Sequence, residues 1–364
     1  MNYKLSGEES RKIDFLRAVS FIMVMYLHQY VGKMDYTDVV IELNRAVFLE
    51  SFEYIVSRII TFSAVPLFFL MSAVLLYAKN FTWQSNMKKK MKTLVLPYIL
   101  WISIYIAIYA VGQALPFTAI YFANAGRQIA DFTIWDFVGA YIGYFGEGLF
   151  VNSMWFIHDL IIFNVLACVI KRIVDKFPIL IFGCVLILWL FAPTKVLLGI
   201  NVQGICFFTL GYYVVKYDLR MSALKTNWIW QILFLYVFAI GFKYYLYLRN
   251  NSLVSPAHGI AIILGIALLI QISHIICEGD KKLPQLLSLV AQNSFFIYAA
   301  HDFIQTVLKK VSGKLFIQTD FVQGIEFIVV PALTCLICLS GALIIKKILP
   351  GTYGILTGGR KQIG

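Results

Sequence analysis

Charged residues are scarce in this sequence. They make up 14% of the 364 residues, whereas hydrophobic residues make up 60% and the mean hydropathy is +0.79. A soluble domain of this length has too little interior to hide so much apolar surface, so the composition excludes an ordinary soluble globular protein. It predicts a protein that crosses a membrane several times.

Acidic residues are the scarcer of the two charged classes. The chain has 19 Asp and Glu against 31 Lys and Arg, which gives a net charge of +12. An excess of positive charge is often associated with nucleic-acid binding, but here the positive residues lie in short connections between apolar runs. This distribution indicates membrane topology, and we expect no nucleic-acid partner.

Cysteine is also infrequent, and its six copies fall mostly inside apolar segments. Cys335 and Cys338 have the spacing of a redox or zinc pair, but they lie within one continuous apolar run. We therefore interpret them as packing residues and predict no metal site. The first apolar run contains charges and lacks a small-residue cleavage site, so we expect no signal peptide.

Long apolar runs dominate the rest of the chain, and about ten of them approach the ~20 residues that span a bilayer. They predict an all-α, polytopic transmembrane bundle in which residues 1–364 form a single membrane domain without a separate soluble domain. The fifth run is short and the sixth contains several polar residues and glycines, so either is compatible with a tilted or partly re-entrant segment. The predicted spans are 13–32, 55–78, 93–112, 153–171, 178–193, 199–216, 228–248, 257–276, 286–308 and 325–348.

The orientation of the bundle follows from its positive charges. If the N-terminus lies inside, the inner connections contain roughly twice as many Lys and Arg as the outer ones. The sequence therefore predicts that both termini are cytoplasmic. Lys309, Lys310 and Lys314 are exceptions, because this topology places them outside.

The first predicted span contains three ionisable residues, Asp14, Arg17 and His28. On a continuous helix, Arg17 and His28 differ by about 20° around the axis and are about 16 Å apart along it. Asp14 lies on a neighbouring part of the same face. Ionisable side chains at such depth are costly and usually face a protein interior or a wet cavity. The alternatives are an interfacial pair in which Arg17 extends to water and a core histidine bonded to another helix.

Asp14, Leu16, Arg17 and His28 together resemble the first-helix motif of the acyltransferase-3 family of integral membrane acyltransferases. Ala73 departs from the family pattern, since glycine is usual there. Each similar stretch is short, but six of them occur in the family's order over nearly the whole chain. The other five are VPLFFLMSAVLLY (65–77), MKKKMKTLVLPY (87–98), MWFIHDL (154–160), FFTLGYYV (207–214) and SFFIYAAH (294–301).

The resemblance implies transfer of an acyl group, usually acetyl from acetyl-CoA, to a sugar hydroxyl. The acceptor it implies is a cell-surface polysaccharide or its lipid-linked precursor, at a bacterial plasma membrane. His28 is the candidate general base, because imidazole accepts protons near neutral pH. Arg17, held by Asp14, is the candidate to bind a phosphate of the donor or the developing oxyanion. An acetyl-histidine intermediate is an open alternative.

Four lysines precede the third predicted span, and they form a candidate site for the donor. Lys88, Lys89, Lys90 and Lys92 are suited to the pyrophosphate and 3′-phosphate of acetyl-CoA, which is found in the cytoplasm. The alternative interpretation is positive-inside anchoring or contact with anionic lipid.

Two further groups are candidates for acceptor binding. Trp155, His158 and Asp159 would lie at the outer mouth, where a sugar can stack on the indole and bond to the carboxylate. Tyr298 and His301, three residues apart on one helix, would support His28 or the acceptor. The alternatives are an aromatic belt at the membrane interface for the first group and buried hydrogen-bonding residues for the second.

A long predicted outer loop, 113–152, is rich in aromatic residues and glycine and includes Trp135, Asp136, Tyr144 and Glu147. It fits either a segment that helps to hold a glycan or an amphipathic cover that lies on the membrane.

Two other functions fit a bundle with intramembrane ionisable residues. One is a secondary transporter or lipid-linked-sugar translocase, although no inverted pair of helices broken by Gly or Pro is present and the lysine cluster has no role there. The other is a sensor or scaffold in which the polar residues only hold helices together.

Overall fold

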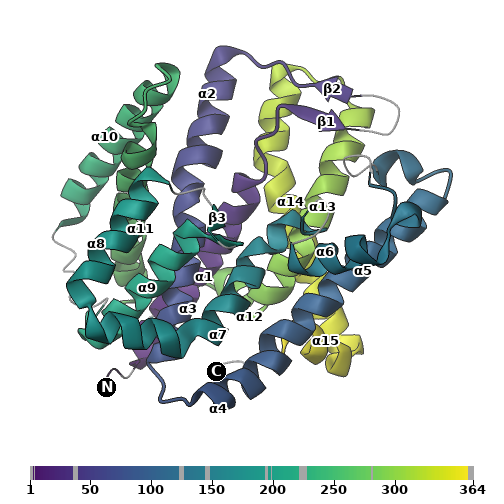
Figure 1. The fold of residues 1–364 in the computed structure, drawn as a ribbon. Coiled ribbons are helices and arrows are strands. Elements are labelled where there is room, and N and C mark those ends of the chain that lie inside the picture. Colours follow the sequence, from purple (N-terminus) through teal and green to yellow (C-terminus); the bar gives the residue numbers. More distant parts are fainter. Residues whose placement is uncertain are drawn as a thin grey trace. The chain divides into compact units, whose positions relative to one another are not determined.

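The chain was analysed as a computed structural model that describes residues 3, 5–35, 40–122, 127–143, 148–192, 196–197, 199–220, 228–279 and 282–359. Helices account for most of the described chain, and the strands form two short antiparallel pairs (Figure 1). The predicted all-α membrane bundle is therefore confirmed as a class.

Within the described residues, six helical segments are long and apolar enough to cross a membrane. Four predicted spans are not among them. At the first, the helix Gly7–Leu27 has at least four charged residues in any 18-residue stretch. The predicted spans 178–193 and 199–216 contain helices of only 14 and 15 residues, and 286–308 is divided between two helices. The count of about ten spans and the cytoplasmic termini thus stay predictions. The six segments are Val47–Tyr77, Trp83–Ala114, Asn152–Lys176, Ile229–Leu248, Val254–Cys277 and Asp320–Ile348.

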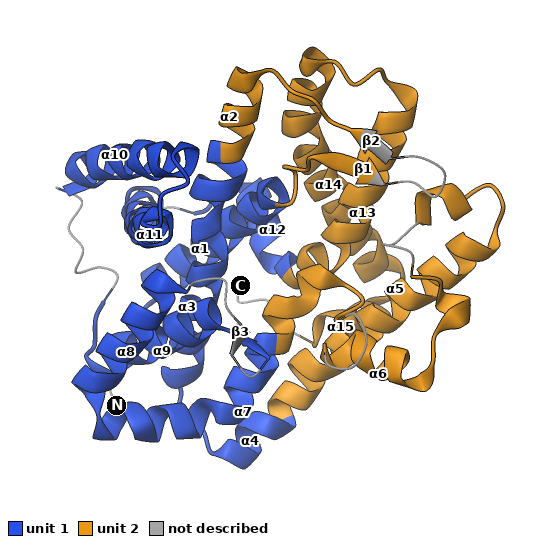
Figure 2. Ribbon diagram, turned by 45° about the horizontal axis from the view of Figure 1, so that its top comes forward, with its two compact units in different colours: residues 1–27, 55–88, 159–294 blue, residues 28–54, 89–158, 295–364 orange. Residues whose placement is uncertain are grey.

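The chain forms two compact units, each built from three separate stretches (Figure 2). Unit 1 contains residues 1–27, 55–88 and 159–294, and unit 2 contains residues 28–54, 89–158 and 295–364. The prediction of one membrane domain is not decided by this division, because the chain passes between the units several times.

Unit 1 is a group of packed helices joined by short connections, and one strand pair precedes α9. A helix that crosses a unit boundary is named here with the unit that holds most of it. The elements are α1 (Gly7–Leu27), a π-helical turn (Val56–Ile60), a 3₁₀ turn (Thr61–Ser63), α3 (Ala64–Tyr77), α4 (Trp83–Lys90), α7 (Trp155–Lys176), α8 (Pro178–Phe191), β3 (Val196–Leu197), β4 (Ile200–Asn201), α9 (Val202–Lys216), α10 (Ile229–Leu248), α11 (Val254–Cys277) and α12 (Gln285–Gln292).

Helix α1 begins earlier and ends earlier than the predicted span 13–32. At its start the Ser6 hydroxyl accepts a bond from the Glu9 amide (3.1 Å), and the Glu9 carboxylate accepts one from the Ser6 amide (3.0 Å). This reciprocal capping box explains why the helix starts at Gly7. Because α1 ends at Leu27, His28 lies one residue beyond the helix, which corrects the expectation that Arg17 and His28 share one continuous helical stripe.

Helices α3 and α9 approach each other closely at Gly211. A Cβ atom placed on Gly211 would lie 2.5 Å from the Ala73 Cβ and 2.6 Å from the Leu70 carbonyl oxygen. The close backbone approach is therefore made by the glycine of α9, opposite the position where the chain has Ala73. The sixth predicted span is also shortened here, because the Asn201 side chain caps α9 by accepting a bond from the Gln203 amide (3.0 Å).

Unit 2 combines two long helices with a strand pair and shorter helices. In the predicted outer loop, Thr133 and Asp136 form a capping box at the start of α6, and the hydrogen bonds from Thr133 lower the pKa of the Asp136 carboxyl. Tyr144 and Glu147 of that loop lie outside the described residues. The elements are β1 (Lys33–Asp35), β2 (Val40–Glu42), α2 (Val47–Ile55), a π-helical turn (Met91–Val95), α5 (Leu96–Ala114), 3₁₀ turns (Ala119–Phe122, Ile129–Asp131, Asn152–Met154), α6 (Ile134–Ile142), α13 (Ser294–Leu315), α14 (Asp320–Ile348) and α15 (Pro350–Thr357).

Candidate active site

His28 is held where the chain leaves α1. The Lys309 ammonium donates a hydrogen bond to the His28 carbonyl oxygen (3.0 Å). The neighbouring Gln29 side chain accepts a bond from the Gln305 amide (2.8 Å) and donates one to the Glu326 carbonyl oxygen (3.3 Å). The Lys309 contact satisfies a backbone carbonyl left without a partner where the helix ends. The Gln29 side chain ties the same segment to α13 and α14.

The His28 ring lies beside the ring of His301, a residue of α13. The two ring centroids are 5.4 Å apart and the planes are tilted by 50°. His301 is 1% exposed, whereas His28 is half-buried. Two predicted site residues, separated by most of the sequence, therefore form an imidazole pair in unit 2.

The protonation of His301 follows from its neighbour Tyr298. The His301 Nδ1 atom lies 2.5 Å from the Tyr298 carbonyl oxygen, which can only accept a hydrogen bond, so Nδ1 carries the proton. The buried Nε2 atom then has a lone pair, and it has no hydrogen-bond partner among the described residues. The Tyr298 hydroxyl donates to the Ser153 carbonyl oxygen, which holds this part of α13 in place. The arrangement leaves a basic nitrogen available.

A cavity of about 320 Å³ in unit 2 is lined along α13 by residues that begin with Asp302, which directly follows His301 in the sequence. Its volume is at the lower end of the range for small-molecule sites. Polar side chains and aromatic rings share its wall. The lining residues are Val31, Lys33, Met34, Tyr105, Tyr109, Phe150, Val151, Asn152, Asp302, Phe303, Thr306, Lys309 and Lys310.

Lys309 and Tyr105 connect this cavity with the histidine pair. Lys309 lines the cavity and bonds to the His28 carbonyl oxygen. The Tyr105 hydroxyl donates to the Ala299 carbonyl oxygen (2.9 Å) and accepts from the Phe303 amide (3.1 Å), so it bridges the α13 backbone on both sides of His301. Lys309 and Tyr105 thus join the cavity wall to the backbone around both histidines, although neither imidazole lines the cavity.

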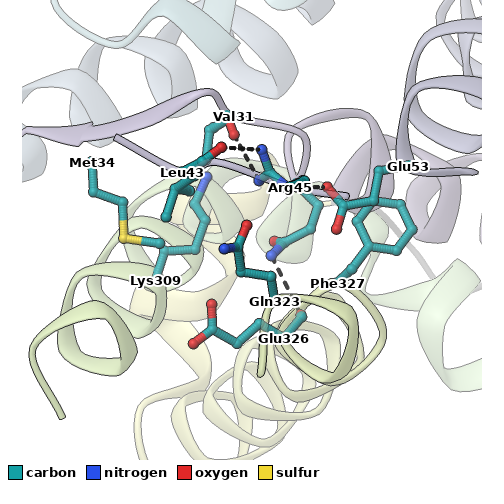
Figure 3. Close-up of a pocket in the computed structure, with 10 residues that line it drawn as sticks. Val31, Met34, Leu43, Arg45, Glu53, Lys309, Gln323, Glu326 and Phe327 are labelled. Atoms are coloured by element: carbon teal, nitrogen blue, oxygen red, sulfur yellow. Dashed lines mark hydrogen bonds and ion pairs between the residues drawn. The ribbon is translucent and has the colours of Figure 1, made fainter. Parts of the chain in front are cut away.

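A second, much smaller pocket of about 10 Å³ shares Val31, Met34 and Lys309 with the cavity and has room for about one water. Figure 3 shows Arg45 turned towards Glu53, while Lys309 enters the pocket from a different helix. The Arg45 and Glu53 side chains form a buried ion pair with an N–O distance of 2.8 Å. The Glu326 carboxylate accepts bonds from Ser312 and from Gln318. The acidic groups of this pocket are thus already bonded, and the pocket is a structural polar core.

Asp14 and Arg17 form the expected pair in unit 1. The Arg17 Nη1 atom lies 2.9 Å from the Asp14 carboxylate, and both side chains are more than a quarter exposed. The contact confirms that the acid holds the guanidinium. Donor binding by Arg17 stays a prediction.

The lysine cluster lies along the helical connection from α4 into α5. Lys88, Lys89 and Lys92 are exposed, and Lys90 is half-buried. A π-helical turn, Met91–Val95, follows directly. Exposed ammonium groups on a helix are available to phosphates, and donor binding by these lysines stays a prediction.

The predicted outer-mouth group is divided between the two units. Trp155 and His158 are half-buried residues of unit 2. Asp159 belongs to unit 1, is 3% exposed, and accepts a hydrogen bond from the Asn201 amide (2.9 Å). Its carboxylate therefore has a structural contact at the start of α9, and sugar binding by these residues stays a prediction.

Several cavity residues were missed from the sequence. In the sequence, Lys309 and Lys310 stood out only because the positive-inside rule disfavours lysines on the outer side. That disagreement was the one feature from which their place in a cavity could have been suspected. Asp302 follows His301 directly and could have been noticed as an acid within an apolar run. Tyr105 and Tyr109 gave no signal, because tyrosines on an apolar helix are common near membrane interfaces.

The fold and the site define a membrane-embedded helical protein in which a half-buried and a buried histidine pair in a unit that also contains a polar cavity. The acyltransferase-3 family model, which describes an acyltransferase domain, matches residues 10–346. The chain therefore belongs to the acyltransferase-3 family and is a membrane acyltransferase, as its motifs indicated. No curated protein and no solved structure matched the chain.

Proposed function

We propose that the protein transfers an acetyl group from cytoplasmic acetyl-CoA to a hydroxyl of a cell-surface polysaccharide or its lipid-linked precursor, at the cell membrane. The observation that supports this reaction best is the pairing of His28 with His301 in unit 2, where Lys309 both lines the cavity and bonds to the His28 carbonyl oxygen. Family membership supports acyl transfer as the type of reaction. The imidazole pair offers a base of the kind that functions near neutral pH.

In the proposed reaction His28 takes the proton of the acceptor hydroxyl as its oxygen attacks the thioester carbonyl. The new C–O bond forms, the C–S bond breaks, and the thiolate of coenzyme A leaves and receives the proton. General-base assistance of this kind contributes about 10²- to 10⁴-fold to the rate. His301 is assigned the role of orienting the His28 ring, because the two ring centroids are 5.4 Å apart and the His301 Nε2 atom has a lone pair that no other described residue uses.

In this proposal acetyl-CoA binds to the basic residues that the sequence predicts on the cytoplasmic side. Lys88, Lys89, Lys90 and Lys92 contact its phosphates, and Arg17, held by Asp14, binds a further phosphate oxygen. The exposure of the lysine side chains and the Arg17–Asp14 ion pair support this assignment.

Replacing Lys88, Lys89 and Lys90 together by Gln is expected to raise the KM for acetyl-CoA about tenfold or more and to change kcat less than threefold, because phosphate contacts made equally in ground and transition states affect binding alone. Steady-state kinetics with membranes that contain the variant measure both constants. An unchanged KM with inverted membrane topology would show that these lysines only anchor the chain.

The proposed activity is tested with membranes that contain the protein, radiolabelled acetyl-CoA and isolated surface glycan. We expect labelled acetyl on the glycan, and no label with membranes from cells that lack the protein. Flux of a solute or lipid-linked sugar without acyl-CoA, and without labelled product, would instead identify a carrier.

A further inference from the structure

One acidic side chain in the cavity of unit 2 is available to a ligand. Asp302 is the single acid among the described residues that line the cavity, and its side chain is half-buried. It accepts no hydrogen bond and forms no ion pair with any residue that the structure describes. A carboxylate has two oxygens that accept hydrogen bonds, so this side chain can hold two donors of a ligand.

The lysines of the same wall already have partners. The Lys309 ammonium donates to the His28 carbonyl oxygen (3.0 Å), and the Lys310 ammonium donates to the Tyr121 carbonyl oxygen (2.9 Å). Lys33 is engaged in an interaction as well. The acid of the wall therefore differs from its lysines, because none of the described residues donates to it.

Asp302 shares one face of α13 with other cavity residues. Thr306 and Lys309 follow it by four and seven residues, which is the spacing of a single helix face. Tyr105 and Tyr109 line the cavity from α5 and are also four residues apart. The bonds of the Tyr105 hydroxyl to the α13 backbone join these two helices. The carboxylate thus belongs to a wall built from ordered helix faces.

Aromatic rings supply another part of the wall. Tyr109 packs against Phe150 with centroids 5.3 Å apart, Tyr105 packs against Phe303 with centroids 6.1 Å apart, and all four residues line the cavity. A sugar ring has faces of C–H groups, which pack on aromatic surface, and an edge of hydroxyls, which needs acceptors. The volume of about 320 Å³ suits one such ring rather than several.

The ring in the cavity differs from the ring that reacts, because neither His28 nor His301 is among the described residues that line it. We propose that the cavity binds the sugar ring next to the acetylated one, and that Asp302 determines this specificity by accepting hydrogen bonds from two of its hydroxyls. The inference rests on the proposed function, because both rings belong to its glycan acceptor. His301 directly precedes Asp302 on α13, so adjacent rings of a glycan meet adjacent positions of one helix.

The test compares one-ring and two-ring fragments of the surface glycan, obtained by partial hydrolysis, as acceptors for the full-length protein in nanodiscs. We expect kcat/KM to be at least tenfold higher for the two-ring fragment. Asp302→Asn preserves the shape of the side chain but removes its charge and one acceptor oxygen. It should raise the KM for the two-ring fragment at least tenfold, change kcat less than threefold, and leave the KM for the one-ring fragment unchanged.

Asp320→Asn is the matched control. Asp320 is an exposed acid at the start of α14, outside the residues that line the cavity, and it accepts a bond from the Ala46 amide (2.8 Å) that an asparagine oxygen also accepts. This variant should keep the same constants within about twofold. If Asp302→Asn does not fold, Thr306→Val, one turn along the same face, should raise the KM for the two-ring fragment about threefold.

The possible failures are distinguishable. Equal kcat/KM for the two fragments, or an Asp302→Asn protein with unchanged constants, would overturn the subsite while acetyl transfer still supports the proposed function. A higher KM for acetyl-CoA alone in this variant would also overturn the subsite, because the cavity would then hold the donor. Saturation-transfer NMR without acetyl-CoA measures binding separately. Binding of the two-ring fragment that depends on Asp302, without any acetyl transfer, would contradict the proposed function and leave the subsite standing, and loss of both would contradict both.

Discussion

Replacement of His28 by Ala is expected to lower acetyl transfer by about 10²- to 10⁴-fold while leaving the amount of folded protein unchanged. The substitution removes the proposed base, and its backbone contact survives because Lys309 bonds to the carbonyl oxygen rather than to the ring. The loss should appear in kcat, since the imidazole acts when the hydroxyl proton moves. Membrane assays with radiolabelled acetyl-CoA, normalised to the monodisperse protein peak in size-exclusion chromatography, measure it.

A histidine of unit 1 provides the matched control for this prediction. His258 packs its ring against Phe62, with centroids 4.9 Å apart. His258→Gln should keep transfer within about threefold, because it changes a packed imidazole remote in sequence from the proposed base. Added imidazole should restore part of the activity of the His28→Ala protein if the missing group is a base. Full activity in the His28→Ala protein would remove the catalytic assignment.

The membrane class and the family were predictable from the sequence, because they depend on local properties. An apolar run near the length needed to cross a bilayer can be recognised from the sequence alone. Short motifs in a fixed order identify the family without any knowledge of the packing. The resemblance also selected His28 and His301. Their ring-to-ring contact was not predictable, since it depends on how the chain after α1 lies along α13.

The end of the first helix and the contacts of several polar residues could not be predicted from the sequence, because they depend on tertiary contacts that a local pattern does not contain. Apolar residues continue past Leu27, yet α1 ends there and Lys309 bonds to the next carbonyl oxygen. Lys309 and Lys310 contradicted the charge rule, and the cavity they line is visible only in three dimensions. Asp159 has a carboxylate contact with the Asn201 backbone that no motif reveals, and its predicted contact with a sugar stays a prediction.

His301 supplies the second large expected effect. If its Nε2 atom orients the His28 ring, His301→Phe should lower kcat about 10²-fold and change the KM for both substrates less than threefold. Phenylalanine fills the buried site but has no ring nitrogen. His301→Gln restores a polar group near the same place and should recover part of the lost activity, measured with the same acetyl-transfer assay.

Tyr298→Phe separates this orienting role from simple support of the helix. It removes the hydroxyl that donates to the Ser153 carbonyl oxygen, but it leaves the Tyr298 backbone carbonyl that fixes the His301 tautomer. The variant should therefore lose some stability and less than tenfold in kcat. If Tyr298→Phe and His301→Phe reduce kcat equally, His301 acts only by packing. A larger loss in His301→Phe at matched folded protein identifies the ring nitrogens as the groups that matter, because phenylalanine fills the buried site but lacks both Nε2 and the Nδ1–H that bonds the Tyr298 carbonyl oxygen.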